Sequence, residues 1–193
     1  MASVFVLHGE SSEEDKDIYT YACEAVISTT INILISLIIS LLFGLILQGV
    51  VFVSVFAFLR RFTGGHHAST HMGCILTFNA VLILALLFYI VVTSSMYFEN
   101  IFLLLISTIS LIGILIFTPV SHDNKPINDI LRQSAKKKSR ILIIVLWVFC
   151  IFDSFVFNTG MGLSIALAMF SVFASLVYAV TINKFTKEGR GIV

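Results

Sequence analysis

Long apolar runs separated by short polar segments dominate the sequence. Residues 25–59 form 35 consecutive positions without a formal charge, whereas one membrane-spanning helix needs about 20. Gly44 and Gly49 lie on either side of Gln48 and offer a turn within this run. Pro119 and the polar segment 158–160 separate later runs. The pattern predicts six transmembrane helices at about 25–43, 46–61, 74–93, 100–118, 141–157 and 162–182.

The composition favours an all-α polytopic membrane protein. Hydrophobic residues make up 58% of the chain and charged residues 12%, where an ordinary soluble domain has about 25% charged residues. Two prolines and 11 glycines suit long helices better than a turn-rich β-barrel. The three cysteines are too few and too scattered for a disulfide framework. We exclude a soluble globular protein, a disordered chain and a nucleic-acid binder, and expect a single integral-membrane domain over residues 1–193.

The N-terminal segment is polar and acidic over its first 24 residues. It lacks the positive n-region and the directly following apolar core of a secretory signal. Ser11 and Glu14 fit a capping box, which predicts a short amphipathic N-terminal helix. A solvated tail is the alternative interpretation of the same residues.

The basic residues all fall on one side of the six predicted spans. The N-terminus, residues 60–73, residues 119–140 and the C-terminus share that side and hold all 12 Lys and Arg residues. The opposite turns hold only Glu99 and Asp153 as charged residues. By the positive-inside rule, both termini and the basic loops are expected in the cytoplasm.

The segment from Arg60 to Cys74 concentrates residues that can do chemistry. It holds three of the five histidines, and Gly64-Gly65 allows the backbone to bend. One interpretation is a cysteine nucleophile with a histidine base. A second is a metal site formed by His67, His71 and Cys74, although there is no HExxH and no carboxylate between Glu24 and Glu99. The third is an interfacial loop without chemistry.

Helical spacing alone favours His71 as the partner of Cys74. On an unbroken helix His67 and Cys74 would be about 10.5 Å apart along the axis, too far for a hydrogen bond. His71 precedes Cys74 by three residues and would be adjacent. His67 can act as the base only where the chain turns between residues 67 and 74.

Two motifs resemble the signature of the AgrB family, the accessory gene regulator protein B peptidases. The family pattern is an arginine, then Gly-Gly-x-His-Ala, then a cysteine seven residues after the histidine, which corresponds to Arg60, residues 64–68 and Cys74. Residues 118–127 are similar to the family's Ala-Pro-Val-x-x-x-Asn-Lys-Pro stretch, with Thr118 in place of the usual alanine. The resemblance covers essentially the whole chain.

The resemblance implies that Cys74 is the nucleophile and His67 the base, with no metal and no cofactor. It implies a cysteine endopeptidase of the bacterial cell membrane, acting in quorum sensing. Such an enzyme removes the C-terminal tail of an AgrD-type propeptide and cyclises the signal peptide through an acyl-enzyme thioester. The expected partners are that propeptide, the lipid bilayer and a second copy of the chain as a homodimer. Residues expected to bind substrate or support the site are Arg60, Gly65, Lys125, Lys136, Lys137 and Lys138.

Several alternatives stay open. A third catalytic group is not evident, and the candidates are Glu24, Asp123 and Asn124; backbone N–H groups of Gly73 and Cys74 are candidates for an oxyanion hole. The basic loop either sets topology and touches anionic lipid or attracts the acidic tail of the propeptide, and the two roles are compatible. The rival class is a non-enzymatic transporter or channel with a His/Cys metal or gating cluster.

Overall fold

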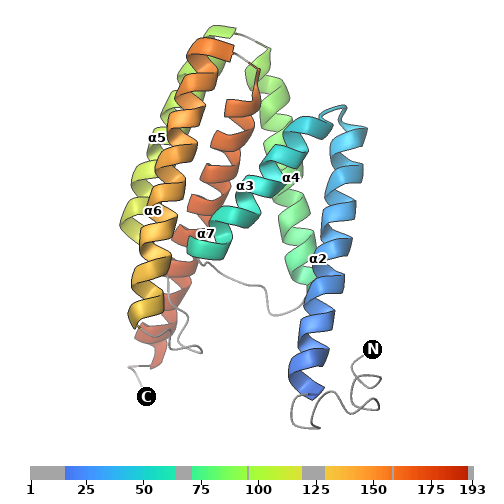
Figure 1. The fold of residues 1–193 in the computed structure, drawn as a ribbon, viewed down its shortest axis with the longest axis vertical. Coiled ribbons are helices and arrows are strands. Elements are labelled where there is room, and N and C mark those ends of the chain that lie inside the picture. The colour runs from blue at the N-terminus through green and yellow to red at the C-terminus, as the bar shows by residue number, and fades with distance from the viewer. Residues whose placement is uncertain (1–15, 64–70, 95, 119–128, 158, 191–193) are drawn as a thin grey trace.

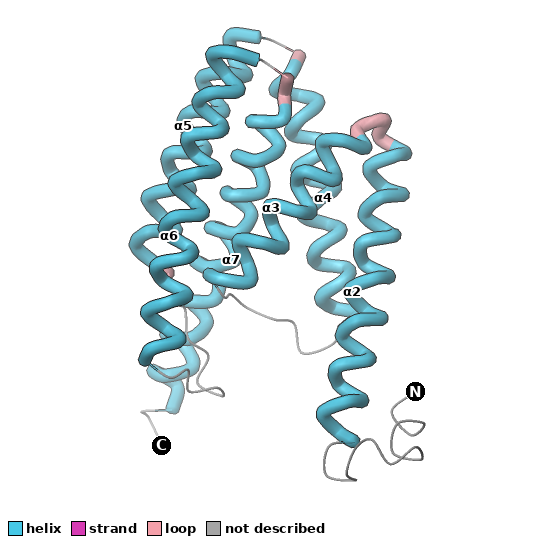
Figure 2. The backbone as a smooth tube through the Cα atoms, viewed as in Figure 1, coloured by secondary structure: helices cyan, strands magenta, loops and turns pink. Residues whose placement is uncertain are grey.

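The computed structural model describes residues 16–63, 71–94, 96–118, 129–157 and 159–190. Every regular element in these ranges is helical, as Figure 2 shows by its colours. Six of the helices are long and apolar enough to cross a membrane, which confirms the predicted all-α, six-span fold. The elements in Figure 1 are α2 (Lys16–Leu42), α3 (Ile46–Thr63), α4 (His71–Thr93), α5 (Met96–Phe117), α6 (Asp129–Phe152), the π-helical turn η2 (Asp153–Phe157) and α7 (Met161–Arg190).

The fifth predicted span differs most from the structure at its start. The sequence pattern predicts a start at Ile141. In the structure α6 begins at Asp129, and the part of it that is apolar enough to span a membrane begins at Lys136. Lysine and arginine are good helix formers, and their long side chains reach the membrane surface while their stems lie along apolar surface. A run of basic residues therefore continues the helix instead of ending it.

Helix α2 runs without a break from Lys16 into the first span. The expected capping box at Ser11 and Glu14 lies outside the described residues. The predicted turn after α2 is present: Gly44 adopts a φ of 70°, in the left-handed region that glycine enters without strain. At Gly49 an added Cβ would lie 1.9 Å from Ser40 Oγ, so only glycine lets α3 pass this close to α2.

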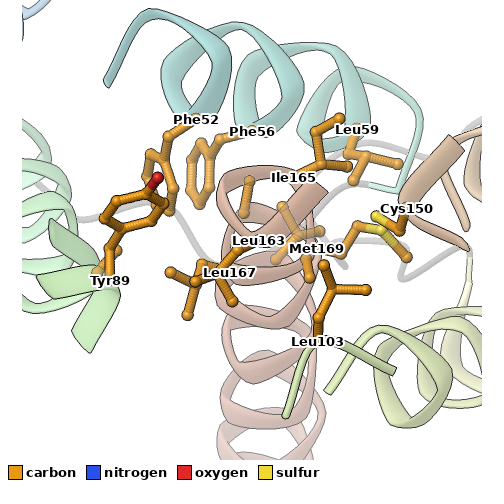
Figure 3. Packing of buried hydrophobic residues seen from close by; sticks show 14 of the residues in the cluster. Phe52, Phe56, Leu59, Tyr89, Leu103, Cys150, Leu163, Ile165, Leu167 and Met169 are labelled. Atoms are coloured by element: carbon orange, nitrogen blue, oxygen red, sulfur yellow. The ribbon is translucent and has the colours of Figure 1, made fainter. Parts of the chain in front are cut away.

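Helix α7 is the centre of the bundle. Residues 162–169 are all buried, and a helix that is buried around its whole circumference lies inside a fold. It packs against α3, α5 and α6 and touches α4. Figure 3 shows the resulting core, in which α7 residues such as Leu163 and Met169 meet Leu59, Leu103 and Cys150 from three other helices.

Helices α2 and α4 lie beside each other and run in the same direction (Figure 1). Asn79 of α4 joins them, because its Nδ2 donates to Asn32 Oδ1 at 2.7 Å and Ser36 Oγ donates to its Oδ1 at 3.0 Å. Asn79 Nδ2 also donates to the carbonyl of Ile75 at 2.8 Å. In hydrocarbon such polar groups need protein partners, so this amide cluster fixes the register of α4 against α2.

We call the end of the bundle that carries Arg60, Arg61 and residues 136–140 the basic end. Its predicted cytoplasmic location can be measured by cysteine labelling in intact cells. Ser94 lies exposed in the turn between α4 and α5, at the opposite end. We expect Ser94→Cys to react with an impermeant maleimide added outside, and Lys137→Cys to react only after the cells are opened. The unmodified chain, whose Cys150 is fully buried, gives the background, and labelling of Lys137→Cys from outside would contradict the topology.

The amide cluster makes a prediction for stability. Asn79→Ala removes two interhelical hydrogen bonds and leaves the Asn32 amide without this partner in the span. Interhelical hydrogen bonds in membranes contribute about 0.6–2 kcal/mol each, so the thermal unfolding midpoint in detergent should fall. The matched control is Thr77→Ala on the same helix, because Thr77 is exposed and its Oγ1 bonds the Gly73 carbonyl within α4. Equal shifts in both variants would contradict a role of Asn79 in helix pairing.

Candidate functional site

Cys74 lies in the first turn of α4, at the basic end of the bundle. Its side chain is partly exposed. The first four N–H groups of a helix have no partner within that helix, and the helix dipole places partial positive charge there. A thiolate at position 74 would therefore lie at the positive end of α4. The expected oxyanion donors, the backbone N–H groups of Gly73 and Cys74, belong to the same turn.

Arg60 provides a second positive charge near this thiol. It lies in the last turn of α3, half-buried, and its Nη1 donates to Ser175 Oγ of α7 at 3.3 Å. Its guanidinium carbon stands 5.5 Å from the centre of the Phe56 ring, a cation–π arrangement. From this position Arg60 interacts electrostatically with Cys74. The structure thus brings together two residues of the sequence motif through contacts that also tie α3 to α7.

Several expected site residues lie outside the described part of the chain. They are Gly65, His67, Asp123, Asn124 and Lys125. The backbone of His71 begins α4, but its side chain is also outside. The bend that would bring His67 to Cys74 must lie between these two residues, and residues 67–70 are outside the described part, so the Cys–His pair and the choice of base stay predictions.

Glu24 is the one candidate for a third catalytic group whose side chain is described. The hydrogen bond between Asn32 of α2 and Asn79 of α4 gives a common reference point, from which the position of Glu24 along the helix axes can be compared with that of Cys74. Glu24 precedes Asn32 by eight residues and Cys74 precedes Asn79 by five. At 1.5 Å per residue, Glu24 therefore lies about one helical turn beyond Cys74, toward the basic end. Among the carboxylates with described side chains, the other two, Glu99 and Asp153, lie at the opposite end.

Asp153 has a structural role that the sequence pattern did not predict. Its side chain is only 3% exposed, and it accepts hydrogen bonds from Thr159 Oγ1 at 2.6 Å and from the Gly162 N–H at 2.8 Å. It therefore caps the N-terminus of α7 from η2. The sequence feature that could have indicated this role is a single acidic residue next to a long apolar run, because an acidic side chain that enters a membrane is paired with a polar partner.

Cys150 donates to the Gly162 carbonyl at 3.4 Å and is fully buried, which fits a packing role.

The three lysines expected to support the site differ in their surroundings. Lys136 is partly buried, whereas Lys137 and Lys138 are exposed. Lys136 and Lys137 line a cleft with Arg140, and Lys138 is not part of its lining. In the described part of the chain, no three His, Cys, Asp or Glu side chains lie close enough to hold a metal ion. The metal interpretation depends on His67, which lies outside that part.

Comparisons with known proteins agree with the motif. The model of the family described as accessory gene regulator B, AgrB, matches residues 1–181. A putative AgrB-like protein of Clostridium perfringens strain SM101 is 28% identical over 162 residues, which is 79% of this chain and 72% of the relative. Putative AgrB-like protein 2 of strain 13 is 28% identical over 163 residues, 79% of this chain and 73% of the relative.

No solved structure matches this chain, so the assignment depends on the sequence comparisons together with the six-span fold. The family match extends over all six membrane-spanning helices. It also includes the segment with Arg60 and Cys74, which the fold places at the basic end. The chain belongs to the AgrB family.

Proposed function

We propose that this protein is a cysteine endopeptidase of the bacterial cytoplasmic membrane that processes an AgrD-type propeptide for quorum sensing. The observation that carries the proposal is the position of Cys74 in the first turn of α4, within electrostatic range of Arg60. The N-terminal end of a helix carries partial positive charge, and the Arg60 guanidinium at the end of α3 adds a cation at the same end of the bundle. Membership of the AgrB family supports a processing role in quorum sensing.

The first step is attack of the thiolate on a peptide carbonyl. His67 takes the proton of the Cys74 thiol, and the sulfur attacks the carbonyl at the junction between the signal segment and the C-terminal tail. A sulfur–carbon bond forms while the carbon–nitrogen bond breaks, and the imidazolium returns its proton to the leaving amine. The product is an acyl-enzyme thioester. Backbone N–H groups in the first turn of α4 are the proposed oxyanion donors.

The second step closes the ring. A cysteine or serine inside the signal segment attacks the thioester carbonyl, which forms a thiolactone or lactone and releases Cys74. Exchange of one thioester for another needs no ATP. The first step exchanges an amide for a more reactive thioester and is uphill, so loss of the tail must draw it forward. Exclusion of water from the site favours ring closure over hydrolysis.

The remaining residues act on the base and on the substrate. Glu24, one turn beyond Cys74 on the neighbouring helix, is the proposed group that orients the base and favours its protonated form. Gly65 supplies backbone freedom for a bend at the membrane surface just before His67. Lys125, Lys136, Lys137 and Lys138 attract the acidic tail toward the basic end by long-range electrostatics.

Substitutions in the motif separate the cysteine mechanism from metal chemistry. Cys74→Ala and His67→Ala should each lower propeptide cleavage by about 10³-fold or more, because nucleophile and base act as one unit. His71→Ala should keep substantial activity. Iodoacetamide should inactivate the enzyme and EDTA should not. The measurement is mass spectrometry of the purified protein incubated with a candidate propeptide, looking for the tail and the cyclised product.

Each variant must first reach the membrane at the level of the unmodified chain. Cys23→Ser is the matched control for alkylation, since Cys23 lies in α2 and its loss should leave iodoacetamide sensitivity unchanged. Inactivation by EDTA that is reversed by zinc would favour the metal interpretation over the Cys–His pair. Full activity of His67→Ala together with loss of activity in His71→Ala would make His71 the base, as helical spacing alone suggests.

The proposed role of Glu24 can be tested by removing its charge. Glu24→Gln should lower kcat with little change in KM, because the side chain acts on the base and not on the substrate. The basic limb of the pH profile should also move to lower pH, because the imidazolium loses an anion that favours its protonated form. Glu99→Gln makes the same change at the opposite end and should leave the profile unmoved. A lower kcat in Glu24→Gln with an unshifted pH profile would assign Glu24 a purely structural role.

A further inference from the structure

A cleft of about 270 Å³ lies on the first part of α6, at the basic end. Among the described residues, its lining consists of Lys136, Lys137, Arg140, Ile141 and Ile144. The lining of the cleft thus combines three basic side chains with two apolar ones. None of these five side chains belongs to the Cys–His pair or to the cap of α7, and the only other role proposed for Lys136 and Lys137 is long-range attraction of the acidic tail.

The order of these residues along α6 matches the layers of a bilayer. Lys136, Arg140 and Ile144 follow one another at intervals of four residues, as do Lys137 and Ile141, so each row stays on one helix face. From Lys136 to Ile144 the cleft extends about 12 Å along the axis. The headgroup layer on each side of a bilayer is about 5–7 Å thick. The cleft therefore begins among headgroups and ends among acyl chains.

The surroundings of α6 leave this face turned toward lipid. The helix packs against α3, α5 and α7, and Ser139 and Ile143 are fully buried on that packed side. Ile141 and Ile144 keep 54% and 46% of their surface exposed. In a membrane this exposed surface is covered by acyl chains. A ligand that fills the whole cleft must therefore join an anionic head to an apolar chain.

We propose that this cleft binds one anionic phospholipid of the surrounding membrane. Lys136, Lys137 and Arg140 hold the phosphate and the negatively charged headgroup, since a guanidinium forks onto phosphate oxygens and the ammonium groups add point charges. Ile141 and Ile144 contact the first part of an acyl chain. A soluble phosphate would use only the polar half of the cleft. The inference does not depend on the proposed peptidase activity.

Two charge-matched double variants distinguish a site from general surface attraction. Lys137→Gln with Arg140→Gln removes two charges from the cleft, whereas Lys138→Gln with Arg61→Gln removes two exposed charges outside its lining. The full chain is reconstituted with phosphatidylcholine or with added phosphatidylglycerol. Native mass spectrometry then counts the retained lipids. We expect one phosphatidylglycerol on the unmodified chain and on the outer double variant, and at least about tenfold weaker retention on the cleft variant.

Further variants and a competing peptide test which kind of ligand occupies the cleft. Ile144→Ser should weaken retention of phosphatidylglycerol without changing the weak binding of inorganic phosphate. Thermal unfolding in phosphatidylcholine alone should be the same for all variants, which controls for folding, and Lys136→Gln replaces the cleft double variant where that variant unfolds. Equal loss of lipid in both double variants would overturn the proposal in favour of surface charge. Displacement of the lipid by a soluble acidic peptide at micromolar concentration would overturn it in favour of a peptide site.

Discussion

The absence of water from bilayer hydrocarbon is the constraint on which the rest of the structure depends. Every backbone N–H and C=O in that layer must find a protein partner, and the described spans meet this demand as helices. Polar side chains follow the same rule. Asn79 is paired with Asn32 and Ser36, and Asp153 accepts the N–H of Gly162 in the first turn of α7. Each pairing fixes one helix against another, so the rule that penalises polar groups also sets the register of the bundle.

The same constraint bears on the position of Arg60 at the basic end. Arg60 is far more costly in hydrocarbon than at the membrane surface, and it occupies the last turn of α3, where Ser175 and the Phe56 ring hold it. Charges interact more strongly beside a low-dielectric layer than in water. A guanidinium fixed at this depth therefore acts on neighbouring groups more strongly than a solvated arginine would. The contacts that tie α3 to α7 also hold this charge at the end of the bundle where α4 begins.

Most of the fold could be predicted from the sequence, because the number of spans in a membrane protein follows from the length of its apolar runs and the positions of its charged residues. The second span, the turn at Gly44 and the helical class all follow from the run of residues 25–59. The start of α6 could not be predicted this way, because hydropathy shows where the apolar segment begins, and the helix itself begins earlier, among charged residues. The capping of α7 by Asp153 was missed because it depends on η2 and on packing between distant turns.

The candidate site was predictable in a different manner. Spacing on one helix favours His71, whereas the motif of the AgrB family favours His67, and neither choice follows from apolar pattern. The electrostatic link between Arg60 and Cys74 joins two helices, so only the folded chain reveals it. The same holds for the height of Glu24, which follows from the pairing of Asn32 with Asn79.

The depth of Cys74 bears on why one cysteine would both cut and cyclise. The residue is partly exposed in the first turn of a membrane-spanning helix. In the proposed mechanism, an acyl-enzyme thioester at this end of an apolar helix would meet few water molecules on its apolar side, which would slow hydrolysis. A nucleophile carried by the bound peptide itself is held beside the thioester at high effective concentration. Under the proposed mechanism, ring closure would then compete with hydrolysis through position alone, with apolar surroundings as the dry side of the site.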